Sequence, residues 1–467
     1  MEAEELTPQE VAVMLISKMK KKARSKTADY LISKYNFATP KDTKHILVYK
    51  DGYYQKNADV VIQEEIKRLW GEECTTQEIA EITKAHIIPQ TYLDREKFNN
   101  NLEYTCLENG VLNLVTGEML PHSPDYKFTF RIPVEYDPEA RCDKIHQFLS
   151  EITDEPEDIK TLLQIIGYSL YRGYPTAKVF VLLGSGRNGK SVFINMVKRF
   201  LGLENVRGLS MQQLEHDDYA KGFLYGKHAN MNPDISNKRI LTSGVIKKLT
   251  GGDTIDSNVK YGDYMMFKNF AKLIFAANDL PTSDDSTYAW LARWIFIKFP
   301  HRYDGEPCPI CYETHPVNKN LEDELCEPGE MSGLLNAVIV ALKNLQADNW
   351  DFTLSEKVRR MEKDYAILSD PVKGFIVDCI IENAESKILK GDVYDKYRVF
   401  CKEIGEEPLI SSAFTTRFKQ HMPGVDDTRG KGGRRFWVGV EIGEKGVQDI
   451  LRDNPEGYAK LGDEVTR

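Results

Sequence analysis

GSGRNGKS, at residues 184–191, is the stretch of sequence that decides how this chain folds. It matches the pattern G-x-x-x-x-G-K-[ST] at every position. The apolar run VFVLL precedes it and the amphipathic run SVFINMVKRFL leads out of it, so a buried strand and a helix flank the loop. Glycines let backbone N–H groups turn toward phosphate oxygens, and the helix N-terminus adds positive potential. The motif therefore predicts a nucleoside triphosphate site formed by Gly184, Ser185, Gly186, Arg187, Asn188, Gly189, Lys190 and Ser191.

Hydrolysis of the nucleotide would need further side chains beyond this loop. Lys190 is expected to reach the β- and γ-phosphates, and the Ser191 hydroxyl to hold Mg²⁺. Asp234, after the next strand-like segment, is the candidate acid for the metal or the attacking water; the alternative is a turn or helix-capping aspartate. Asn278 follows a third strand and could orient the water. Arg293 opens a fourth strand, where a lone arginine is more often a surface residue.

The order of segments around the loop predicts the fold class. Four strand-like runs, at 179–183, 227–232, 273–277 and 294–299, alternate with longer polar or helical stretches. Alternation of this kind favours an α/β domain with a mostly parallel central sheet. A helical lead-in at 143–175 and an amphipathic helix at 329–345 would complete a domain spanning 143–345.

The two flanking regions differ from this pattern. Residues 1–142 mix helical and short strand-like segments, which predicts an α+β N-terminal domain. Within 365–445, three short helices are expected at 371–384, 392–405 and 411–422, followed by the basic, glycine-rich turn TRGKGGRRFWVGVEI. Three helices and a basic hairpin suggest a winged helix. Arg434 and Arg435 would then contact DNA phosphates, the alternative being a solvated hairpin.

Composition bounds the remaining possibilities. With 467 residues, the chain has the length of about three domains. The net charge of −9 argues against a surface coated in positive charge but allows a local basic channel. Neither a signal peptide nor an apolar run of the ~20 residues needed to cross a membrane is evident. Eight cysteines in a chain this long indicate a reducing cytoplasm rather than a disulfide scaffold.

The order of the motifs adds a family resemblance. GSGRNGKS, NPDIS, KKLTGGDTI, KLIFAANDLP and AWLARWIFIKF together resemble the superfamily 3 helicases, in particular the phage, plasmid and viral primase-helicase branch. Residues 102–150 and 370–440 resemble the domains on either side of the motor in that branch. The resemblance implies an AAA+ type ATP- and Mg²⁺-dependent replicative DNA helicase in the host cytoplasm. Such proteins form hexameric rings that move 3′ to 5′ on single-stranded DNA at a fork.

The resemblance also assigns roles to residues. Lys190 and Ser191 become the Walker A residues, Asp234 the Walker B acid, Asn278 the sensor and Arg293 the finger that reaches a neighbouring subunit's ATP. A pore hairpin is expected within 250–268. Its DNA contacts would be Lys260, Tyr261 and, more weakly, Lys248.

The chain departs from the family pattern in three places. The second strand is unusually polar, and its acid stands without an acidic neighbour. No Asp-x-Asp pair is present to hold two metal ions for priming, so a separate primase or polymerase is expected. A cysteine-rich insertion occupies 304–327. Within it Cys308, Cys311, His315 and Cys326 could form a tetrahedral Zn²⁺ site, or be free thiols beside an incidental histidine.

Two other functions fit parts of this pattern. One is an origin-binding or loading protein that uses nucleotide as a switch and unwinds little. The other is an ATPase that remodels proteins, which single-stranded DNA would not stimulate. A rolling-circle nickase is disfavoured because no His-x-His pair is present to bind its metal.

Overall fold

The computed structural model describes residues 6–233, 243–257 and 265–443, apart from positions 282, 284, 286, 309, 369 and 405. These residues form two compact units. The first takes the described parts of 1–235, 244–276 and 297–355, and the second those of 236–243, 277–296 and 356–467. Three predicted site residues, Asp234, Lys260 and Tyr261, lie outside the described residues.

The N-terminal region of the first unit contains both helices and strands, in agreement with the α+β region predicted there. Its helices pack around Ile62, Ile66 and Trp70, which lie four residues apart on one face of α3 and are almost fully buried. A four-stranded sheet in the order β3-β2-β1-β4 accompanies them. The elements are α1 (Pro8–Ile16), α2 (Lys20–Lys34), β1 (Phe37–Pro40), β2 (Leu47–Lys50), β3 (Tyr53–Gln55), α3 (Ala58–Trp70), α4 (Thr76–Glu81), α5 (Ile88–Gln90) and β4 (Tyr92–Leu93).

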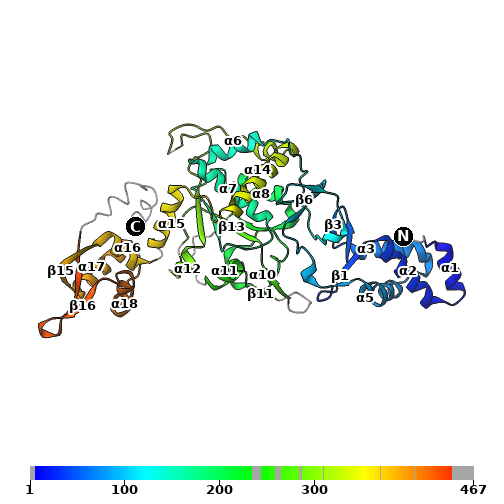
Figure 1. Ribbon diagram of the computed structural model, residues 1–467, viewed down its shortest axis with the longest axis horizontal. Coiled ribbons are helices and arrows are strands. Elements are labelled where there is room, and N and C mark those ends of the chain that lie inside the picture. The colour runs from blue at the N-terminus through cyan, green and yellow to red at the C-terminus, as the bar shows by residue number, and fades with distance from the viewer. Residues whose placement is uncertain are drawn as a thin grey trace. The chain divides into compact units, whose positions relative to one another are not determined.

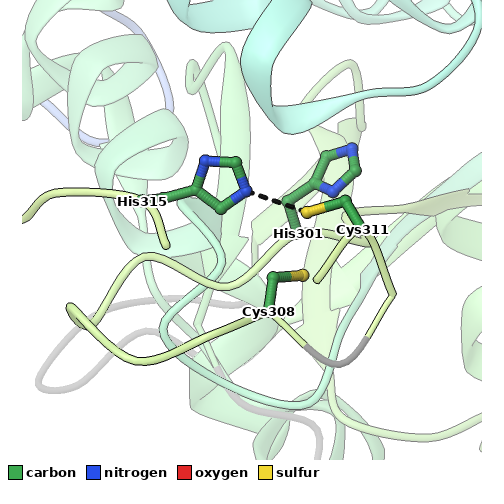
Figure 2. Close-up of side chains that lie close together, drawn as sticks. All are labelled: His301, Cys308, Cys311 and His315. Carbon is green, nitrogen blue, oxygen red and sulfur yellow. Dashed lines mark hydrogen bonds between the residues drawn. The ribbon is translucent and has the colours of Figure 1, made fainter. Parts of the chain in front are cut away.

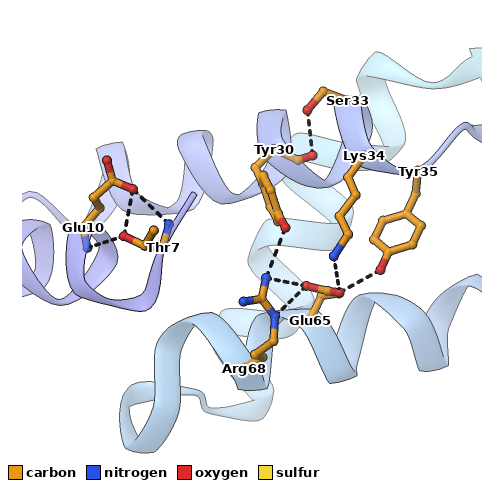
Figure 3. A network of polar contacts seen from close by, with 8 residues as sticks. All are labelled: Thr7, Glu10, Tyr30, Ser33, Lys34, Tyr35, Glu65 and Arg68. Carbon is orange, nitrogen blue, oxygen red and sulfur yellow. Dashed lines mark hydrogen bonds and ion pairs between the residues drawn. The ribbon is translucent and has the colours of Figure 1, made fainter. Parts of the chain in front are cut away.

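Glu65 joins helices α2 and α3 through a network of polar contacts, drawn in Figure 3. Its carboxylate accepts hydrogen bonds from Nζ of Lys34 and the hydroxyl of Tyr35, both at 2.7 Å, and from the guanidinium of Arg68 at 2.9 Å. Burial opposes the charged form, but these donors outweigh it and lower the pKa of Glu65 to about 2. The ionised carboxylate is therefore part of what holds the two helices together.

Replacing this carboxylate should make the region less stable in a pH-dependent way. Because the pKa falls from 4.5 to about 2 on folding, the stabilisation is complete above 4.5 and is lost as pH falls toward 2. Glu65→Gln should lower the free energy of unfolding at neutral pH by about 1–3 kcal/mol, measured by urea titration. The difference from the unchanged protein should shrink as the pH falls below 4.5. Glu64→Gln, at an exposed neighbouring position, should have little effect.

A small antiparallel sheet, in the order β5-β6-β7, connects this region to the helical lead-in. Arg172, just after α7, is buried and donates to the backbone carbonyls of Tyr104, at the start of β5, and of Asn99 and Asn101 just before it. Its guanidinium also lies over the ring of Phe130. The elements are β5 (Tyr104–Leu107), β6 (Gly110–Asn113), β7 (Met119–Leu120), α6 (Asp143–Ile152) and α7 (Pro156–Leu170).

The central sheet has five strands in the order β14-β8-β13-β10-β9, and β10 runs parallel to both β13 and β9. All four predicted strands are present, and β9 is an additional short edge strand. This arrangement confirms the α/β core with a mostly parallel sheet. The strands are β8 (Val179–Leu183), β9 (Val206–Arg207), β10 (Ala229–Asn232), β13 (Lys272–Ala277) and β14 (Trp294–Lys298).

Strand β10 is buried despite its polar sequence. The side-chain amide of Asn230 accepts from the backbone N–H of Leu209 at 2.8 Å and donates to its carbonyl at 2.9 Å. His228, just before the strand, bonds the carbonyl of Ser169 through Nδ1 at 2.8 Å. A buried polar group costs little when it is hydrogen-bonded in this way. The polar sequence is therefore compatible with a central strand.

Helices surround this sheet (Figure 1), and α7 packs directly on α14. A Cβ placed on Gly167 would lie 2.9 Å from the carbonyl oxygen of Val338, so the helices approach more closely there than a side chain allows. The remaining elements of the central region are α8 (Lys190–Leu201), α9 (Met211–His216), α10 (Asp218–Gly222), α11 (Ser243–Thr250), β11 (Thr254–Ser257), β12 (Met265–Lys268), α12 (Tyr288–Leu291), α13 (Leu321–Leu325) and α14 (Pro328–Ala347).

The C-terminal part of the second unit has its own core, which includes Phe375, Tyr397, Phe414 and Trp437. One prediction fails here: residues 380–384, expected to continue a helix, instead begin strand β15. Ile380 pairs with Ile442 across an antiparallel sheet in the order β15-β17-β16. The elements are α15 (Glu356–Leu368), α16 (Pro371–Cys379), β15 (Ile380–Leu389), α17 (Lys390–Glu403), α18 (Ser411–His421), β16 (Asp426–Arg429) and β17 (Arg435–Ile442).

Candidate functional site

The loop at 184–189 joins β8 to α8, as the motif predicts. Gly189 caps α8 with a φ of 85°, and a Cβ there would meet Ile152 Cγ2 at 2.7 Å. A Cβ on Gly184 would overlap the side chain of Asn188 at 1.6 Å and approach the carbonyl oxygen of Phe299 at 2.8 Å. Only glycine fits these two positions, because the first requires a left-handed backbone and the second leaves no space.

Lys190 lies in the first turn of α8, with 8% of its surface exposed. Its ammonium donates to the carbonyl of Gly184 and, at 3.0 Å, to Oδ1 of Asn188. Burial lowers the pKa of Lys190 to about 8. No carboxylate is among these bonded partners, so a phosphate group would supply the negative charge that this lysine lacks.

The loop at 184–189, the candidate phosphate-binding loop, is braced from the side by the segment that follows β14. Nδ2 of Asn188 donates to the carbonyl of Phe299 at 3.1 Å, and the carbonyl of Arg187 accepts from the backbone N–H of Tyr303 at 2.7 Å. The Arg187 side chain also pairs with the nearly buried Asp304 at 3.3 Å. Ser185 and Ser191 are exposed, so Ser191 is accessible for the predicted metal contact.

Two other predicted catalytic residues, Asn278 and Arg293, both belong to the second unit. Asn278 is exposed and directly follows the last residue of β13. Arg293 lies between α12 and β14, where its guanidinium donates to the carbonyl of Ala289 in the preceding helix.

Strands β11 and β12 form an antiparallel hairpin within the region where a pore hairpin is expected. Ile255 pairs with Phe267, and both side chains are buried at the base of the hairpin. Of the predicted DNA contacts here, Lys260 and Tyr261 lie outside the described residues. Lys248 is exposed on α11, which precedes the hairpin.

Arg434 and Arg435 lie at the turn between β16 and β17, where both are exposed. Arg435 pairs with Arg429 across the two strands, and the backbone N–H of Gly430 donates to the carbonyl of Arg434 at 2.9 Å. Like charges directly opposite on a hairpin repel each other. The turn thus presents a concentration of positive charge that an anionic partner would relieve.

A separate cluster of sulfur and nitrogen atoms forms after β14. His301, Cys308, Cys311 and His315 each place one potential ligand atom within 4.8 Å of the others. Figure 2 shows the four side chains turned toward one another, and Sγ of Cys311 lies 3.1 Å from Nε2 of His315. Three of these residues were predicted. The fourth, His301, was not, because it precedes the insertion.

The predicted ligand Cys326 is not in this cluster. It directly follows helix α13, and Arg199 of α8 interacts with it. That helix is held on α8 by hydrogen bonds from Asn195 to Glu322 and from Arg199 to Asp323. Cys326 was predicted as a ligand because it is close to the other three residues in the sequence. Helix α13 is attached to α8, however, and this holds Cys326 beside Arg199 instead of in the cluster.

Comparisons with known proteins find three family models along the chain. Residues 5–154 match a D5 N-terminal-like family, and residues 368–437 match a poxvirus D5 protein-like family. Between them, residues 182–293 match DUF5906, a family of unknown function. The matches follow one another in the order of the predicted N-terminal, central and C-terminal regions.

Two viral relatives are similar over part of the chain. A candidate helicase of Acanthamoeba polyphaga mimivirus is 28% identical in an alignment of 207 residues that covers 41% of this chain and 21% of that protein. A candidate primase of African swine fever virus is 22% identical in an alignment of 260 residues that covers 51% of this chain and 26% of that protein. The chain thus spans about a quarter of the length of the curated relatives it matches.

Among solved structures, the apo C-terminal region of NrS-1 has a similar fold. The TM-score is 0.52 at 13% identity, over 90% of this chain and 99% of that one. At this identity the likeness concerns the fold alone.

Within the described part of the chain, no helix combines the length and apolar character required to span a membrane.

Proposed function

We propose that this protein is an ATP-driven replicative DNA helicase. The basis is its resemblance to the viral superfamily 3 primase-helicases, which the family models and the viral relatives confirm. The protein would act as a ring, with six subunits by resemblance, that moves 3′ to 5′ along one strand of a fork. A separate primase or polymerase would supply primers. The site of action would be the cytoplasm of the infected host cell.

The observation that carries this proposal is the position of the hairpin β11–β12. The chain inserts it between β10 and β13, which are adjacent, parallel strands of the sheet that holds the phosphate-binding loop. An element attached to both strands would move when nucleotide binding shifts either of them. That connection could convert the hydrolysis cycle into displacement of bound DNA.

In this proposal the nucleotide is ATP with Mg²⁺, bound on the loop at 184–191. Lys190 neutralises phosphate charge, and Ser191 with Asp234 holds the metal. Asn278 orients the attacking water, and Arg293 reaches the ATP of a neighbouring subunit. Each of these residues has a distinct role, so single substitutions should separate nucleotide binding from hydrolysis.

DNA would be contacted at two places. Lys260 and Tyr261, with Lys248 as an accessory, would hold the single strand in the pore. The C-terminal helices and sheet, acting as a winged helix, would bind duplex or a loading site through Arg434 and Arg435. The repulsion between exposed arginines at the turn supports this second contact.

The decisive test is ATP turnover with and without single-stranded DNA, together with strand displacement on a forked duplex. A helicase should show stimulated turnover and displace the strand. ATP-dependent duplex binding with little turnover and no displacement would instead support an origin-binding or loading protein. Turnover unaffected by DNA would favour an ATPase that acts on protein.

Removing the two turn arginines should weaken duplex binding while sparing the motor. With Arg434→Ala and Arg435→Ala together, two phosphate contacts are lost, so the dependence of log affinity on log salt should fall by up to about 1.8. Fluorescence anisotropy over a salt series measures this. Unwinding of a preloaded fork at saturating DNA should persist, whereas Lys260→Ala should abolish it.

A matched control removes the same charge elsewhere. Arg359→Ala with Arg360→Ala alters two exposed arginines on α15 and should leave the salt slope unchanged. If that pair lowered the slope as much as the turn variant, bulk charge would account for the effect. If the turn variant lost unwinding while Lys260→Ala kept it, the arginines of the turn would be the translocating contact and Lys260 would not.

A further inference from the structure

The cluster after β14 has the ligand types of a closed, tetrahedral metal site. Two cysteine sulfurs and two histidine nitrogens are the set that zinc takes in structural sites. Around a tetrahedral zinc ion the ligand atoms lie about 3.3–3.8 Å apart, given bonds of about 2.0–2.3 Å. The four atoms here already lie within 4.8 Å of one another, so small side-chain adjustments would bring them to an ion.

The ring of His301 supplies an independent indication of a ligand. Its Nε2 lies 3.0 Å from a carboxylate oxygen of Asp154. Its other nitrogen, Nδ1, is buried and lacks a hydrogen-bond partner of ordinary geometry. Metal-binding histidines commonly pair one nitrogen with a carboxylate and direct the other at the ion. His301 is therefore held in the orientation of a ligand, with one nitrogen left over.

The backbone around the two cysteines also favours ligation. Residues 307 and 314 pair as an antiparallel bridge, and the backbone N–H of Cys308 donates to the carbonyl of Glu313 at 2.8 Å. The turn brings both sulfurs to the same side.

We propose that His301, Cys308, Cys311 and His315 bind one Zn²⁺ ion, and that this ion fixes the segment bracing the phosphate-binding loop. His301 lies within that segment, between Phe299, which bonds Asn188, and Tyr303, which bonds Arg187. Fixing His301 to the cysteine turn therefore fixes the side support of the loop. The role of the ion is structural, because all four coordination positions are filled by protein.

Metal analysis of protein purified without chelator tests the site. The expected result is about one zinc per chain, reduced to a small fraction by Cys308→Ser or Cys311→Ser. Cys326→Ser is the matched control, since it removes a cysteine of the same insertion and should retain the zinc. Absence of zinc from the unchanged protein, or equal loss in all three variants, would overturn the proposal.

Two further variants keep the test decisive if the serine variants fold poorly. Asp154→Asn removes the charge of the carboxylate that pairs with His301 and should weaken zinc affinity by about 10–100-fold in a competition titration with a chromophoric chelator. His315→Cys should retain zinc, because Cys₃His is also a standard set, whereas His315→Ala should not. Unchanged affinity in Asp154→Asn, or zinc retained by His315→Ala, would contradict this ligand arrangement.

The link to the phosphate-binding loop has its own readout. Protein stripped of zinc should bind Mg-ATP several-fold more weakly in isothermal titration calorimetry, and re-addition of zinc should restore the affinity. Unchanged affinity after verified removal would refute the bracing role while leaving the metal site intact. Neither measurement depends on DNA unwinding, so failure here is distinguishable from failure of the proposed helicase function.

Discussion

Lys190→Ala should reduce ATP hydrolysis by at least about 10²–10³-fold, the usual consequence of removing one preorganised donor to developing negative charge. The ammonium is nearly buried at the start of α8 and bonds only to Gly184 and Asn188 among the described residues, so phosphate would be its first anionic partner. Lys190→Met, which keeps the length of the stem, should behave similarly. Turnover measured at saturating ATP checks both variants.

A lysine on the same helix provides the control. Lys198 lies eight residues further along α8 and is partly buried, so Lys198→Ala tests whether loss of any lysine from the helix impairs turnover. It should hydrolyse ATP normally. Circular dichroism should show intact folding in all three variants. Full turnover in folded Lys190→Ala would remove the nucleotide-driven motor from the proposed function.

The pH dependence of ATP binding gives a second view of the same lysine. Burial lowers the pKa of Lys190 to about 8, so the free protein loses this positive charge as the pH rises through that value. Bound phosphate favours the charged ammonium of Lys190. ATP binding is therefore weaker above pH 8 than below it. ATP affinity should therefore decline between pH 8 and 9.5, and the Lys190→Ala variant should lack this decline.

The strand–loop–helix unit around residues 184–191 could be predicted from sequence because the signals that form it are contiguous, although Phe299 and Tyr303, which brace the loop, could not. The strand, the glycines and the helix are contiguous, and each restricts the backbone by its own chemistry. The same holds for the turn at Cys308 and Cys311. The helix expected over 371–384 ends earlier, at Cys379, and its last five residues begin strand β15, because Ile380 and Ile381 suit either structure. Their partners lie on β17, some sixty residues away.

The fourth member of the cysteine cluster could not be predicted in the same way. His301 lies three residues after the end of β14, and the pairing of Asp154 with its ring orients it beside the cysteines. Cys326 seemed suitable because it belongs to the same insertion, but helix α13 carries it to Arg199. A histidine just after a strand and just before a Cys-x-x-Cys turn was the available signal for His301.

Arg293→Ala should bind Mg-ATP almost normally and hydrolyse it at least about 10³-fold more slowly, if its guanidinium stabilises the transition state on a neighbouring subunit. Within its own chain the guanidinium donates to the carbonyl of Ala289, a contact that could be exchanged for a phosphate. Calorimetry measures the binding and steady-state turnover the hydrolysis. Arg360→Ala, at an exposed position on α15, is the control for loss of one arginine and should remain active.

Mixing distinguishes an arginine that acts between subunits from one that acts within its own. A Lys190→Ala subunit keeps Arg293 but cannot use ATP, whereas an Arg293→Ala subunit keeps a complete phosphate-binding loop. In a mixed ring, Arg293 of a Lys190→Ala subunit can reach the ATP bound to a neighbouring Arg293→Ala subunit. Mixing the two inactive preparations should therefore restore part of the activity. Because the recovery requires contact between unlike subunits, it should rise and fall with mixing ratio. Rings shown by native mass spectrometry to be mixed, yet inactive at every ratio, would place Arg293 outside the shared site.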